Sequence, residues 1–161
     1  MIPILFEDKD ILAVNKPGGI ASIPERREGK ECLLSLLSSK FKEKLCVVHR
    51  LDKEVSGVIL FAKNAASHKH LNDQFSNRLV KKTYVALTHG VITEESGVID
   101  KPIRQFGSGR MGVDLQRGKS SVTEFHVTER LGAYTLVKVH TLTGRRHQIR
   151  VHFYSIGHPI V

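Results

Sequence analysis

The apolar side chains of this chain fall in short runs separated by polar or glycine-containing turns. The clearest run, Val58 to Ala62, has the length and the branched side chains of a buried strand. Runs at residues 4–6 and 11–14 predict two further strands joined by a polar turn. No run approaches the length of a membrane-spanning helix, and 161 residues are enough for one domain with a substantial core.

Two segments in the first half have the spacing of amphipathic helices. Apolar side chains recur every three or four positions in residues 31–41, so we expect a short helix whose leucines are buried. A second helix should follow Asn64, the predicted N-cap, with Leu71, Phe75 and Leu79 on one side.

The second half is dominated by strand patterns. Residues 83–88 alternate as a strand, and two longer alternating segments predict a hairpin around Gly132. Residues 92–120 are poor in apolar side chains and predict a long basic loop or a set of irregular hairpin arms. A last helix should begin near Thr143 and stop at Gly157. The predicted class is α+β, a mixed and mainly antiparallel sheet with a few flanking helices.

The charge balance favours a polyanionic partner. Lysine and arginine number 25 against 16 acidic residues, which gives a net charge of +9. Nucleic acid and an anionic membrane surface both fit this surplus, as does a basic soluble protein without such a partner. Cys32 and Cys46 lack the spacing of a metal site and are too few for a disulfide framework, which favours a reducing compartment.

The histidines do not predict a metal site. His68 and His70 are two residues apart on a predicted helix and would point in different directions. His147 and His152 are five apart, a poor match to the i, i+4 pairs of zinc-binding helices. We therefore predict no metal.

A charged cluster directly precedes the run at Val58. It contains Arg50, Asp52, Lys53 and Glu54. An aspartate beside cations can act as a nucleophile or base, or form a structural ion pair, and spacing alone favours the ion pair. Lys16, before a Pro-Gly-Gly loop, has two open interpretations, contact with phosphate or simple solvation.

Five motifs, in order along the chain, resemble those of the RluA-type pseudouridine synthases. They read ILFEDKDILAVNKPGGI, HRLDKEVSGVILFAKN, KKTYVALTHG, GKSSVTEFHVTER and TGRRHQIRVHFYSIGHPIV. The resemblance implies the pseudouridine synthase catalytic fold over residues 1–161, without the family's usual C-terminal continuation and without an S4-like N-terminal domain. A truncated, non-catalytic RNA-binding relative is the alternative.

The same resemblance implies a reaction and its residues. Uridine in RNA would be isomerised to pseudouridine without a cofactor or metal. Asp52 would be the essential carboxylate, Arg150 would pair with it, and Tyr84 would lie over the uracil. Ile149 would line the pocket, and Arg50 would contact a phosphate and fill the space left by the flipped base. Taken alone, Tyr84 also fits an ordinary cross-strand aromatic and Arg150 a solvated helix residue.

Further cations fit contact with the RNA backbone, whose neutralisation makes affinity salt-dependent. The predicted RNA-binding residues, besides Arg50 and Ile149, are His49, Arg104, Arg110, Arg117, Lys119, Arg145 and Arg146. The expected partner is an rRNA or tRNA stem-loop, and we expect a cytoplasmic monomer that does not bind membranes.

Overall fold

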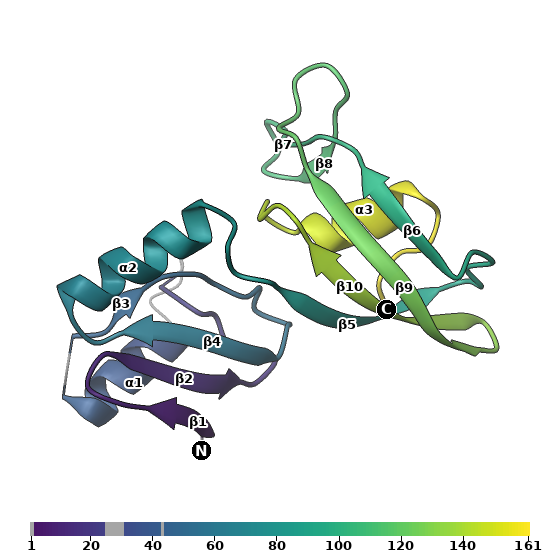
Figure 1. Cartoon of the computed structure of the whole chain (residues 1–161). Helices are drawn as coiled ribbons and strands as arrows, with labels where there is room; N and C mark the ends of the chain where they lie inside the picture. Colours follow the sequence, from purple (N-terminus) through teal and green to yellow (C-terminus); the bar gives the residue numbers. More distant parts are fainter. Residues whose placement is uncertain (1, 25–30, 43) are drawn as a thin grey trace. The chain divides into compact units, whose positions relative to one another are not determined.

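A computed structural model describes residues 2–24, 31–42 and 44–161 (Figure 1). The chain forms two compact units, Met1–Leu79 and Val80–Val161, which we call the N-terminal and C-terminal units. Each unit has a four-stranded sheet, at least one helix and its own hydrophobic core. The α+β class predicted from the sequence is confirmed.

The N-terminal unit is built on an antiparallel sheet that packs against a helix. In sheet order its strands are β1 (Ile4–Glu7), β2 (Ile11–Lys16), β4 (Gly57–Ala62) and β3 (Cys46–Val47), and its helices are α1 (Leu33–Phe41) and α2 (Ala65–Ser76). The register pairs Val14 with Ile59, and both side chains are fully buried. Leu33 and Leu37 of α1 pack against them in one core cluster. The predicted strands and the predicted helix with buried leucines are confirmed.

The second predicted helix is confirmed at its start and differs at its end. Asn64 is the N-cap of α2, since its side chain accepts a hydrogen bond from Ser67 N at 2.9 Å. The helix ends at Ser76, two residues before Arg78 adopts a left-handed backbone with φ of 59°. Leu79 therefore lies outside the helix and is 68% exposed, so its predicted place on the apolar side was wrong.

The C-terminal unit has a second antiparallel sheet, with one helix. In sheet order its strands are β5 (Thr83–His89), β10 (Tyr134–Thr141), β9 (Val122–Leu131) and β6 (Ser96–Asp100), followed in the chain by helix α3 (Gln148–Ser155). The predicted hairpin around Gly132 is β9–β10. Phe125 of β9 meets Phe153 of α3 edge to face, with ring centroids 5.6 Å apart, so the core lies between the sheet and α3.

Residues 92–120 form ordered hairpin arms. They contain β6, which joins the main sheet, and a separate two-stranded hairpin, β7 (Ile103–Gln105) with β8 (Met111–Val113). Of the two alternatives, the hairpin arms are confirmed. The sequence did not predict β6 because only Val98 and Ile99 are apolar side chains in it, and Val98 is exposed.

The last helix starts later than the sequence predicts. α3 begins at Gln148, five residues beyond Thr143, and His147 before it has a left-handed backbone with φ of 54°. Thr143 Oγ1 instead donates to Gln148 Oε1 at 2.8 Å, which closes a turn over residues 143–147. The predicted stop is confirmed, because Gly157 has φ of 85°. None of the helices in the described residues is long and apolar enough to span a membrane.

Candidate active site

Residues 48–56, which we call the aspartate loop, connect β3 to β4. Their backbone is fastened to the segment after β2. Ser22 Oγ donates to Leu51 O at 2.7 Å and accepts from Leu51 N at 3.1 Å. Gly19 N donates to Lys53 O at 2.9 Å. Hydrogen bonds from another segment of the unit thus hold the loop on both sides of its aspartate, which is half-buried.

Lys16 fastens the same loop from inside the unit. Its side chain is fully buried. The ammonium group donates to three backbone carbonyls, those of Pro17, Ile20 and Lys53, at 2.8, 2.8 and 2.9 Å. Burial lowers the pKa of Lys16, while the negative charges of Glu54 and Asp52 raise it. A buried cation therefore lies within electrostatic range of the candidate carboxylate.

Both sequence interpretations of Lys16, phosphate contact and solvation, were wrong. The strand alternation could have located it. Leu12, Val14 and Lys16 occupy every second position of β2, so they share one face, and all three are fully buried. A lysine at the inward end of a strand is tolerated here because carbonyl oxygens satisfy its donors.

His49 is built into the unit at the start of the aspartate loop. Its ring stacks on Phe75 of α2 with centroids 4.7 Å apart and an interplanar angle of 19°. Its Nε2 accepts a hydrogen bond from Leu60 N in β4 at 3.0 Å. Arg50, the next residue, is exposed. The histidine thus joins the loop to a strand and a helix, whereas the arginine faces solvent.

The other candidate catalytic residues belong to the C-terminal unit. Tyr84 of β5 pairs with Val139 of β10 and packs against the core of this unit. Ile149, in the first turn of α3, packs against the same core. Arg150 follows it and is exposed. The structure brings Tyr84 and Ile149 to one core, and Asp52 belongs to the other unit.

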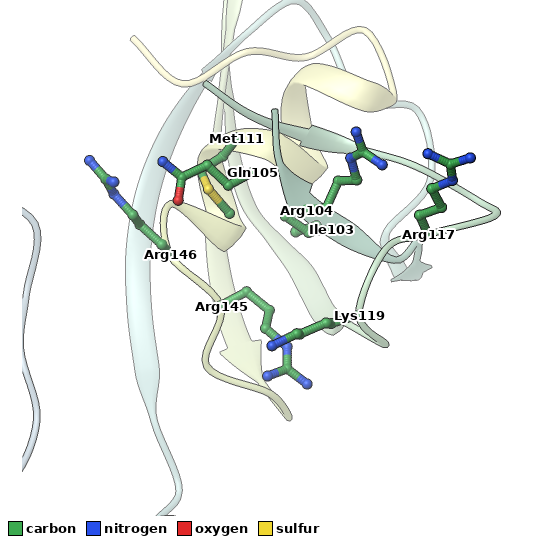
Figure 2. Close-up of a pocket in the computed structure, with 8 residues that line it drawn as sticks. All are labelled: Ile103, Arg104, Gln105, Met111, Arg117, Lys119, Arg145 and Arg146. Carbon is green, nitrogen blue, oxygen red and sulfur yellow. The ribbon is translucent and has the colours of Figure 1, made fainter. Parts of the chain in front are cut away.

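Most of the predicted backbone-contacting cations line one cavity of the C-terminal unit. This cavity, of about 430 Å³, we call the basic pocket (Figure 2). It is lined by Ile103, Arg104, Gln105, Met111, Arg117, Lys119, Arg145 and Arg146. Five of the six predicted cations are among these residues, and Arg110 is not. No acidic side chain lines the pocket.

Gln148 is a residue that the sequence reasoning missed. Its side chain is 4% exposed and makes four hydrogen bonds. Oε1 accepts from Thr143 Oγ1 at 2.8 Å and from Arg145 N at 2.9 Å. Nε2 donates to Val122 O and to Thr123 Oγ1, both at 2.9 Å. Its partners Val122 and Thr123 lie some 25 residues earlier in the chain, so no local pattern in the sequence indicated this role.

His152 is also internal. Its Nδ1 lies 2.8 Å from Thr123 Oγ1, and its Nε2 lies 2.9 Å from Lys101 O. Burial lowers its pKa, so the neutral ring is favoured. Within the described ranges, no three histidine, cysteine, aspartate or glutamate side chains come close enough to hold a metal ion.

Comparison with known proteins identifies the family. The family model described as RNA pseudouridylate synthase matches residues 10–155. The chain belongs to the RNA pseudouridylate synthase family. A relative from Vibrio vulnificus, the dual-specificity RNA pseudouridine synthase RluA, is 42% identical over 98% of this chain and 66% of its own length. The uncharacterized RNA pseudouridine synthase YlyB of Bacillus subtilis is 38% identical over 99% of this chain and 55% of its own length.

Solved structures agree with the family assignment. The human RNA pseudouridylate synthase domain containing 1 superposes with a TM-score of 0.85 at 31% identity, over 100% of this chain and 67% of that chain. The chain spans about half the length of the first curated relatives that it matches, 55%, 54% and 53%.

In a family that modifies RNA, the two kinds of group described above have distinct chemical uses. A half-buried carboxylate on a fastened loop suits nucleophilic or general-base chemistry, which requires a fixed orientation. An open pocket of arginine and lysine suits phosphate oxygens, which guanidinium groups bind in a bidentate manner.

Proposed function

We propose that this protein is an RNA pseudouridine synthase that isomerises uridine to pseudouridine through Asp52. The observation that carries the proposal is the fastened aspartate loop, with its half-buried carboxylate, in a chain whose family match extends over residues 10–155. A carboxylate held in this way meets the geometric demand on a nucleophile or base.

The reaction is an isomerisation and needs no external atom. The bond between N1 of uracil and C1′ of ribose breaks, the base turns while it is held, and C5 bonds to C1′. The C5 proton leaves and N1 takes up a proton. Asp52 either attacks C1′ to form a covalent intermediate or removes a sugar proton to give a glycal. Both routes require the ionised side chain.

The remaining residues act on the flipped nucleotide. Taking uridine out of a stacked RNA costs a few kcal/mol. In this proposal Arg50 contacts a phosphate and fills the vacated space, and His49 holds the start of the loop that carries it. Tyr84 lies over the uracil and assists removal of the C5 proton. Ile149 lines the site that holds the flipped uracil, which is distinct from the basic pocket. The role that we propose for Arg150, from the family resemblance, is to pair with the Asp52 carboxylate.

We further propose that the substrates are stem-loops of rRNA or tRNA and that the protein acts as a cytoplasmic monomer. The support for structured RNA is chemical. Folded RNA is recognised through its backbone and through unstacked bases, and cations suited to backbone contact gather in the basic pocket. Arg110, outside this pocket, would add a further backbone contact.

The proposal is tested by tritium release from stem-loop transcripts that carry 5-³H-uridine. Asp52→Asn keeps the shape of the side chain and removes its charge, so we expect a loss of about a thousand-fold or more in rate. Asp73→Asn, which removes an exposed charge from α2 of the same unit, is the matched control and should retain activity.

Fluorescence anisotropy, which measures RNA binding, completes the test. Equal tritium release by Asp52→Asn and the wild type would overturn the role of Asp52. A wild-type protein that binds RNA in a salt-sensitive manner but releases no tritium would be a non-catalytic RNA-binding protein, and the isomerase proposal would be wrong.

A further inference from the structure

We infer that the basic pocket is a separate binding site for the sugar–phosphate backbone of RNA. In this site phosphates lie between the cations, and one nucleotide lies over Met111. The inference rests on the proposed function for its ligand, RNA, but assigns the pocket to binding and not to the isomerisation. Its occupancy should change affinity and salt dependence and leave the rate at saturating RNA unchanged.

The charge of the pocket favours an anionic ligand. Five of its eight lining residues are cations, and none is acidic. In Figure 2, Lys119 and Arg145 extend toward one another at one end of the pocket. Like charges at close range repel, so this arrangement is most stable when an anion lies between the two groups.

One wall of the pocket is fixed before any ligand binds. Arg145 and Arg146 stand on the turn before α3, and Gln148 bonds both this turn and β9. Thr143 Oγ1 also accepts from Val122 N at 3.0 Å. The Arg145 side chain is itself directed by a bond from its Nε to Ser120 O at 3.2 Å. This wall therefore needs little reorganisation to receive a phosphate.

The opposite wall is fixed by Asp114, which does not itself line the pocket. Its Oδ1 accepts from Gln116 N at 3.0 Å and from Arg117 N at 2.9 Å, which shapes the turn that carries Arg117. Its Oδ2 lies 3.3 Å from the Arg104 guanidinium. These bonds from the backbone keep the pKa of Asp114 below its ordinary value, so it stays ionised.

Arg104 is held in place by an aromatic ring and an ion pair with Asp114. Its guanidinium lies 4.7 Å from the centre of the Phe106 ring, so its plane is held by an aromatic face. Its Nε is buried and has no hydrogen-bond partner among the described residues. Lys119 is placed beside it by paired backbone bonds with Ile103, at 2.9 and 3.0 Å.

The size and lining of the pocket point to a nucleotide unit. About 430 Å³ is within the range of small-ligand sites and exceeds what one phosphate group fills. Met111, Ile103 and Gln105 supply an uncharged part of the lining, where a thioether can contact a base or ribose. A chain of such units linked by phosphates, as in RNA, matches both parts.

The sequence offers a direct probe of the pocket. It contains two methionines, Met1 and Met111, so ¹³C-methyl labelling of methionine gives a sparse spectrum with one reporter in the lining of the pocket. The spectrum is recorded with Asp52→Asn, to prevent turnover, upon addition of inorganic phosphate, uridine 5′-monophosphate or a uridine-containing RNA stem-loop. Met111→Leu assigns the signal. We expect the RNA to shift the Met111 signal at far lower concentration than either small anion.

Two charge-matched double variants test the cations. Lys119→Gln with Arg145→Gln removes two charges from the pocket, and Lys69→Gln with Lys138→Gln removes two exposed charges elsewhere. The pocket variant should bind RNA about 10- to 100-fold more weakly at low salt, and its salt slope should fall by about 1.4 to 1.8. Its kcat should equal that of the control, and it should lose the Met111 response to RNA.

The outcomes separate this inference from the isomerase proposal. RNA that binds without shifting Met111, or equal affinity and salt slope of the two double variants, would overturn the pocket and leave the isomerase proposal standing. A Met111 response without tritium release would overturn the isomerase proposal and support the pocket. A pocket variant with a lowered kcat would show that these cations act in the chemistry, against the inference.

Discussion

The two units use their cations in opposite ways. The N-terminal unit has 13 lysines and arginines against ten acidic residues, and the C-terminal unit has 12 against six. In the first, Lys16 is fully buried, and its ammonium group donates hydrogen bonds to three backbone carbonyls. In the second, five cations line an open pocket without an acidic neighbour in its lining.

This difference shows that a basic residue beside a glycine loop can bond the protein's own backbone and need not contact a ligand. Lys16 acts on the protein's own backbone and holds the aspartate loop, whereas Arg145 stands on a turn that other residues hold. In both units the groups proposed to meet RNA depend on a buried polar side chain, Lys16 in one and Gln148 in the other. Removing each of these side chains in turn is the sharpest way to distinguish the roles of the two units.

The largest effect is expected from Lys16→Met. Methionine fills a similar length but leaves Pro17 O and Ile20 O without their donor, and each buried unsatisfied group costs about 1–3 kcal/mol. We expect the N-terminal unit to lose about 3 kcal/mol of its free energy of unfolding. The aspartate loop also loses one of its bonds, so kcat should fall more than RNA affinity.

Two natural probes report the units separately. Both cysteines, Cys32 and Cys46, lie in the N-terminal unit, and all three tyrosines lie in the C-terminal unit. In urea titrations of Lys16→Met, thiol labelling of buried Cys32 should therefore report the lower stability of the N-terminal unit. The unfolding curve followed by tyrosine fluorescence should change little. Lys9→Met, at an exposed position before β2, is the control. A Lys16→Met protein with unchanged thiol protection would contradict the role of this lysine.

The sequence was informative where periodicity and local chemistry agree. The strand at Val58 to Ala62, the leucines of α1 and the N-cap Asn64 follow from side-chain spacing and short-range hydrogen bonding. The motifs identified the family. These features depend on neighbours within a few residues, which is the information that a single sequence contains.

The sequence was uninformative where distant groups decide the structure. α3 starts at Gln148 because the side chain of this residue bonds Val122 and Thr123, some 25 positions away. Lys16 is buried because carbonyls, including that of Lys53, receive its donors. The basic pocket joins cations from residues 104 to 146, and their spacing in sequence does not indicate that Arg110 lies outside it.

An intermediate effect is expected from Gln148→Leu, this time in the C-terminal unit. The change leaves Arg145 N without a partner, removes the bonds from Gln148 to Val122 O and Thr123 Oγ1, and frees the turn that carries two pocket arginines. We expect a loss of about 2 kcal/mol, seen in tyrosine fluorescence and not in thiol labelling. RNA affinity should fall with kcat unchanged, the reverse of Lys16→Met. A Gln148→Leu protein with wild-type RNA affinity would indicate that the pocket forms without this turn.

The smallest of the three effects is a pH dependence confined to the C-terminal unit. Burial, aided by the charge of Lys101, holds the pKa of His152 below its ordinary value of 6.5, against the bond to Lys101 O and the charge of Asp100. The unfolded chain then binds a proton more readily than the folded one. The free energy of unfolding should therefore reach its highest value above about pH 6.5, and should fall as the pH drops toward the pKa of His152 in the folded protein.

Urea titrations followed by tyrosine fluorescence between about pH 5 and 8 would measure this dependence. His152→Gln removes the titrating group, so its stability should change less over this window than that of the wild type. His126→Gln, at an exposed position of β9, should keep the wild-type slope and is the control. Thr123 Oγ1 bonds both His152 and Gln148. In Gln148→Leu this part of the core is already loosened, so the loss of stability at low pH should be smaller than in the wild type. An equal acid effect in Gln148→Leu would show that the two buried side chains stabilise the unit independently.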